Sequence, residues 1–116
     1  MKKIGQYGLG PETIHVYADP SSKGGSLHSL ESGGVKVVVG TDQEWPNTIG
    51  VLVHELVELA LSQLRCRWVP DIDLALASDG YLFTADHAEF SEACARVGKA
   101  MSYILPDLSR EYKRKK

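Results

Sequence analysis

Residues 51–61, VLVHELVELAL, carry a histidine and two glutamates whose spacing suits metal chemistry. On an α-helix, positions four apart lie about 40° apart around the axis and about 6 Å along it, so His54 and Glu58 can converge on one ion. Imidazole nitrogen and carboxylate oxygen are both competent zinc ligands. Glu55 lies about 100° around the helix, where it would meet a metal-bound water. Because zinc lowers the pKa of such a water, a neighbouring carboxylate can take its proton, which is the chemistry of metal-assisted hydrolysis.

The stretch HELVE resembles the active-site helix of the zincin metallopeptidases in a variant form, H-E-x-x-E. The resemblance implies that His54 is the first zinc ligand and Glu55 the general base, with Glu58 in place of the family's second histidine ligand. Zinc is favoured by the resemblance, although the same ligands also suit iron or manganese. The chain is also similar in size and simplicity to small proteins of phages and mobile elements.

A third ligand must come from outside this helix, and zincins usually draw it from further along the chain. His87, in TADHAEF, is the best candidate, and Asp86 and Glu89 are the alternatives. With His87, the ligands would be two histidines and one carboxylate, a catalytic type of set that leaves the fourth position open to water.

Three interpretations of the motif remain open. The first is a hydrolase of peptide or related amide bonds. The second is a non-catalytic zincin-like scaffold that binds or inhibits a protein or peptide partner. The third is an amphipathic helix whose polar stripe, which includes Glu55, faces water. A peptidase would need a cleft beside a sheet edge, and the strand at 35–39 is the candidate for that edge.

The segment before the motif predicts a small antiparallel sheet over residues 13–40. Alternation over 13–19 and the β-branched run 35–40 predict two strands, and 26–31 gives a weaker one. The SGG before Val35 is a hairpin signal. The glycine-rich residues 1–11 indicate an irregular segment or a loose edge.

Two helices are expected after the sheet. Apolar residues at three-to-four spacing predict the first over residues 48–66. The second is expected over 85–105, with Thr84 as its N-cap and Pro106 as its end. Between them, 68–80 is predicted to be loop and 81–83 a short strand. The fold class is therefore α+β, a zincin-like single domain over residues 1–109 followed by a basic tail at 110–116.

Composition places the chain among ordinary globular proteins: 116 residues, of which 43% are hydrophobic and 24% charged. Cys66 and Cys94 form no C-x-x-C pair, which argues against a cysteine zinc site, and Cys94 is expected to be a buried core thiol. No signal peptide or membrane-spanning stretch is recognisable, so we expect a cytoplasmic protein with no membrane contact.

Charge is unevenly distributed along the chain. The formal net charge is −2, and the last seven residues alone contribute +4, which leaves −6 on the rest. A basic end of this kind is typically a solvated tail. Nucleic-acid contact through it is the less favoured alternative.

Overall fold

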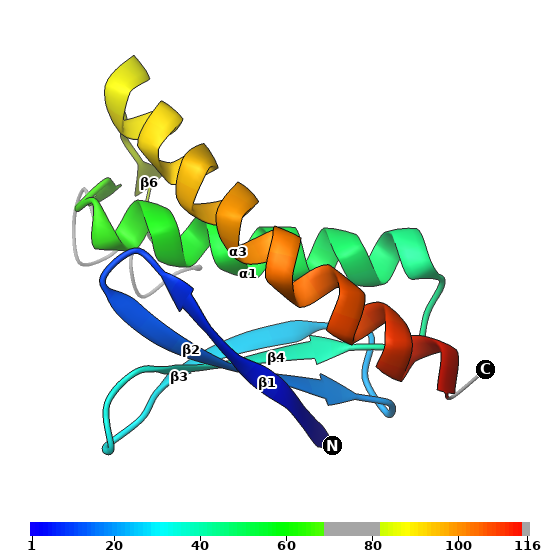
Figure 1. Cartoon of the computed structure of the whole chain (residues 1–116). Helices are drawn as coiled ribbons and strands as arrows, with labels where there is room; N and C mark the ends of the chain where they lie inside the picture. Colours follow the sequence, from blue (N-terminus) through cyan, green and yellow to red (C-terminus); the bar gives the residue numbers. More distant parts are fainter. Residues whose placement is uncertain (69–81, 115–116) are drawn as a thin grey trace, which may run out of the picture.

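The computed structural model describes residues 1–68 and 82–114 and shows a four-stranded sheet with two long helices on the same side of it, beside a small two-stranded sheet (Figure 1). The elements in chain order are β1 (Lys2–Leu9), β2 (Glu12–Asp19), β3 (Gly25–Ser29), β4 (Val35–Gly40), α1 (Trp45–Gln63), β5 (Arg67–Trp68), β6 (Leu82–Phe83) and α3 (His87–Arg114). The expected α+β class is confirmed. The loop predicted over 68–80 falls almost entirely outside the described residues.

The main sheet is mixed, so the prediction of an antiparallel sheet is wrong. Its strand order is β1-β2-β4-β3. β1 and β3 run antiparallel to their neighbours, whereas β2 and β4 run parallel to each other. The β3–β4 hairpin forms as expected, but it inserts β4 beside β2 and leaves β3 at the edge. β4, VKVVVG, is buried at all but one of its positions, which suits a central strand paired on both sides.

The glycine-rich N-terminus forms a regular strand, contrary to the irregular segment predicted for residues 1–11. β1 pairs with β2 from Lys2↔Ala18 to Leu9↔Glu12, with one irregularity between Lys3 and Gly5. Gly10 closes the hairpin with a φ of +56°, a conformation that costs glycine little. The alternation of apolar and polar residues does not reveal β1, because glycines stand at positions where an apolar or polar side chain would show the pattern.

The first helix, α1, begins at Trp45, three residues before the predicted start, with Pro46 in its first turn. A proline is tolerated there because the N–H it lacks would have no partner within the helix. The helix ends at Gln63, and Arg65 follows with a φ of +60°. The N–H of Cys66 then donates to the carbonyl of Leu61, which satisfies one of the last helical acceptors.

The last helix, α3, continues past Pro106 to Arg114, so the predicted end at Pro106 is wrong. Ile104, Leu108 and Glu111 are buried along one face across the proline, and this packing outweighs the missing hydrogen bond. The start also differs from the prediction. Asp86, and not Thr84, caps the helix: its carboxylate accepts from the N–H of Glu89 while its own N–H donates to the Glu89 carboxylate.

The core lies between the sheet and the two helices. Most of its large, fully buried side chains come from β2, β4 and both helices, and β1 adds Leu9. Those of β2, β4 and the helices include Ile14, Val16, Val37, Val39, Leu52, Leu56, Ile104 and Leu108. Residues 110–114 of the expected tail belong to α3, and Glu111 turns inward there to pair with Lys2 of β1 at 3.2 Å. Across residues 1–68 and 82–114, no helix has the length and apolar character needed to cross a bilayer.

Candidate functional site

The motif residues His54 and Glu58 lie one turn apart on α1, with His54 Nε2 and Glu58 Oε2 3.5 Å from each other. The His54 side chain is 71% exposed and that of Glu58 26% exposed. A tetrahedral ion with ligands at about 2.0–2.2 Å separates two donor atoms by about 3.3–3.6 Å. The observed separation lies in that range, so the pair could hold an ion with little rearrangement. As a simple surface ion pair it would contribute little to stability.

Glu55 lies on the buried side of α1, which contradicts the prediction that it shares a solvated polar stripe. The residue is only 8% exposed. Burial raises the pKa of its carboxyl, repulsion from Glu58 raises it further, and His54 partly opposes both effects. A carboxylate with a raised pKa accepts a proton more readily, which is the property required of a general base.

The edge strand β3 packs directly against this part of α1. A Cβ on Gly25 would lie 2.6 Å from Val51 Cγ1, 3.0 Å from the Val38 carbonyl oxygen and 3.1 Å from Glu55 Cγ. Only glycine therefore fits between β3 and the helix without displacing a neighbour. Nothing in the sequence pattern reveals this contact, because it joins two segments about thirty residues apart.

An open hollow of about 590 Å³ lies beside the motif. It is lined from β3, the loop after β4 and the N-terminal half of α1 by Gly25, Gln43, Pro46, Asn47, Gly50, Val51, His54 and Glu55. The Gln43 amide holds the loop by donating to the carbonyls of Lys23 and Gly40 at 2.8 and 2.9 Å. The edge beside this hollow belongs to β3, because the strand at 35–39 is interior, contrary to the expectation from sequence.

The predicted third ligand is not brought to the pair. His87 is the first residue of α3, and the start of α3 rises away from α1 above the C-terminal part of that helix (Figure 1). The alternatives Asp86 and Glu89 are bonded to each other in the helix cap. Over the part of the chain that the structure describes, no three or more His, Cys, Asp or Glu side chains are grouped so that they could hold an ion.

The two cysteines differ from each other in their surroundings. Cys66 is buried, and burial raises the pKa of its thiol, with the nearby Glu89 carboxylate raising it further. Cys94 is exposed, so the prediction that it is a core thiol is wrong. It lines an apolar groove of about 310 Å³ between α1 and α3, together with Val57 and Phe90.

The motif therefore supplies two converging donor atoms, one buried carboxylate and a hollow beside an edge strand. The likeness to the zincin active-site helix that the sequence suggests is carried by residues 54–58. Comparisons of the chain with protein-family models, curated proteins and solved structures found no significant match.

Proposed function

We propose that the chain is a small metal-dependent hydrolase of peptide or related amide bonds. His54 and Glu58 bind a divalent ion, and Glu55 is the general base. The observation that carries the proposal is the 3.5 Å separation of His54 Nε2 and Glu58 Oε2, which matches two ligands of one tetrahedral ion. The ion is zinc by resemblance, and iron or manganese would suit the same donors.

A bound ion would lower the pKa of a water molecule and polarise the substrate carbonyl. The chain's own contribution is to place Glu55 beside that water and to shield its carboxylate. Glu55 is adjacent to His54 and lines the same hollow, and its burial increases its affinity for a proton. After accepting the proton of the attacking water at a carboxylate oxygen, it can deliver it to the departing amine.

The edge strand β3 supports a peptide as the substrate class. An edge strand presents backbone N–H and C=O groups on one side that no neighbouring strand pairs. Gly25 of β3 lines the hollow with His54 and Glu55, so a peptide added along β3 would pass the proposed ion. Backbone pairing would hold such a peptide extended with little dependence on its sequence.

Isothermal titration with zinc tests the site. We expect one equivalent to bind, and His54→Ala and Glu58→Ala each to abolish binding. His28→Ala is the matched control because His28 is an exposed histidine on β3 outside the hollow. His87→Ala tests the predicted third ligand separately: weaker binding would add His87 to the site, and unchanged binding would remove it.

Turnover of a quenched fluorescent peptide library tests the chemistry. Glu55→Gln should keep the metal and lose hydrolysis, since an amide cannot act as the base. If zinc binds but the wild-type protein hydrolyses no peptide, the chain is instead a metal-containing scaffold for protein binding. If no metal binds, the proposal fails and HELVE is a surface of an amphipathic helix.

A further inference from the structure

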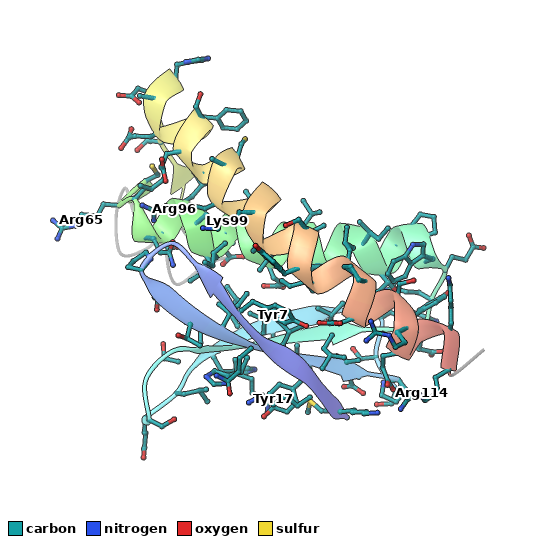
Figure 2. The ribbon with its side chains drawn as sticks, viewed as in Figure 1. Tyr7, Tyr17, Arg65, Arg96, Lys99 and Arg114 are labelled. Atoms are coloured by element: carbon teal, nitrogen blue, oxygen red, sulfur yellow. The ribbon has the colours of Figure 1, made fainter. Side chains whose placement is uncertain are left out.

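The second face of the four-stranded sheet is open. Both long helices lie on one side of the sheet (Figure 1), where the side chains of Ile14, Val16 and Ala18 are buried. The alternate residues of β2 therefore point to the opposite side. Figure 2 shows the difference for two tyrosines: Tyr7 lies between the sheet and α3, whereas Tyr17 lies on the side away from the helices.

Strand register arranges the open face in two rows of side chains. One row runs across all four strands, and its members are Gln6, His15, Lys36 and His28. The neighbouring row consists of Lys3, Tyr17, Val38 and Ser26. An aromatic ring thus lies near the centre of the face, with lysines and histidines around it.

The two lysines of this face have no carboxylate partner among the described residues. Lys3 Nζ contacts Gln6 Oε1 at 3.2 Å and His15 Nδ1 at 3.0 Å, and Lys36 Nζ lies 4.7 Å from the centre of the Tyr17 ring. The one carboxylate on these strands that shares the face is Asp19, at the end of β2, and it accepts two hydrogen bonds from Ser21. Lys3, Lys36 and Asp19 together give this face a net charge of +1, whereas the formal net charge of the whole chain is −2.

We propose that this open face binds single-stranded nucleic acid, with a base stacked on Tyr17 and phosphates contacted by Lys3 and Lys36. An aromatic ring on a sheet flanked by cations meets both requirements of a single strand, whose bases offer π-faces and whose backbone is negative. Polar side chains lie in the same rows, where Gln6 Oε1 accepts from Lys3 and His28 Nε2 is hydrogen-bonded to Ser26 Oγ. The surface does not overlap the His54–Glu58 pair.

A nucleic acid explains the arrangement better than an acidic peptide. Either partner would form ion pairs with the lysines, but only a nucleic acid offers a planar base that can stack on the Tyr17 ring. Lys36 lies over one face of the Tyr17 ring, where a cation–π contact holds the tyrosine in the surface, so the base stacks on the other face of the ring. Because every base has a π-face, the expected binding is sequence-tolerant and strongly dependent on salt.

Fluorescence anisotropy with a labelled oligouridylate of about twelve nucleotides tests the proposal. Tyr17→Ala should weaken binding about 5- to 150-fold, the range found for losing one stacked base. Tyr17→Phe keeps the ring and should bind within about twofold of wild type. The double variant Lys3→Gln, Lys36→Gln should reduce the slope of log K against log salt by about 1.4, as expected for two phosphate contacts on a single strand.

The matched control is Lys113→Gln, Arg114→Gln, which removes the same charge from the end of α3. Loss of binding in this control with no effect of the sheet variants would overturn the proposal in favour of the basic C-terminus. Absence of oligonucleotide binding at low salt would also overturn it. Displacement of the oligonucleotide by polyglutamate as readily as by unlabelled RNA would indicate an acidic protein partner instead.

Circular dichroism checks that each variant is folded. If Tyr17→Ala unfolds, the double lysine variant and Tyr17→Leu decide the question.

Discussion

Replacing Tyr7 with phenylalanine removes a single oxygen that joins the first strand to the last helix. The Tyr7 hydroxyl donates to Asp107 Oδ2 at 2.7 Å, and the two residues are 100 positions apart in the sequence. The hydrogen bond lowers the pKa of Asp107, an effect that burial opposes and that Arg110 reinforces. Burial and Asp107 raise the pKa of Tyr7, so the hydroxyl stays protonated and remains a donor at every relevant pH.

The expected loss of stability follows from the charge and exposure of the acceptor. A hydrogen bond to an ionised group contributes about 1.5–3 kcal/mol. Asp107 keeps Arg110 at 3.1 Å, and its side chain is 35% exposed, so solvent screens part of the interaction. We therefore expect Tyr7→Phe to lower the free energy of unfolding by about 1–2 kcal/mol. For a chain of this length that corresponds to a fall in Tm of about 4–8 °C.

Urea unfolding followed by circular dichroism measures this effect as a function of pH. Because the folded pKa of Asp107 lies below its ordinary value of 3.8, the interaction stabilises the fold fully above that value and is lost as pH falls through the folded pKa. The difference between wild type and Tyr7→Phe should therefore shrink in strong acid. A cycle with Asp107→Ala, which removes the acceptor, should give a coupling of about 1 kcal/mol. An effect of Tyr7→Phe below about 0.3 kcal/mol near neutral pH, or zero coupling, would refute the reasoning.

Three further perturbations follow from the same packing. Leu56→Ala should lower the free energy of unfolding by about 3–5 kcal/mol in urea titrations, because Leu56 is fully buried beneath α1. Gly25→Ala should cost about 1–3 kcal/mol, since the added Cβ would lie 2.6 Å from Val51 Cγ1, whereas Gly50→Ala, with open space at its Cβ, should not destabilise the protein. A thiol reagent should label Cys94 rapidly in the native protein and Cys66 only on unfolding; equal rates would contradict their different burial.

The strands β2 and β4 are predictable because alternation and β-branched runs determine which residues face a core. Their parallel pairing is not, since a periodic pattern specifies a face and not a neighbour. β1 escapes prediction because its glycines interrupt the pattern, yet pairing with β2 over most of its length makes it a strand. The continuation of α3 past Pro106 depends on the tertiary packing of Leu108. Local helix propensities cannot predict this packing.

The candidate site also has features that the sequence predicts and features that it does not. Helical spacing alone predicts that His54 and Glu58 converge, and the structure places them 3.5 Å apart. The burial of Glu55 is not predictable, because it depends on Gly25 of a strand that the sequence does not place beside α1. A third ligand would come from a distant segment of the chain, so its position is not predictable either. His87 stays a prediction for the titration to test.

The most direct test of the proposed metal site is the zinc content of the purified protein by elemental mass spectrometry, after zinc loading and removal of excess. The account predicts about one equivalent in wild type and in His28→Ala, and none in His54→Ala or Glu58→Ala. A wild-type protein without zinc, or a content that the His54 and Glu58 substitutions leave unchanged, would contradict it.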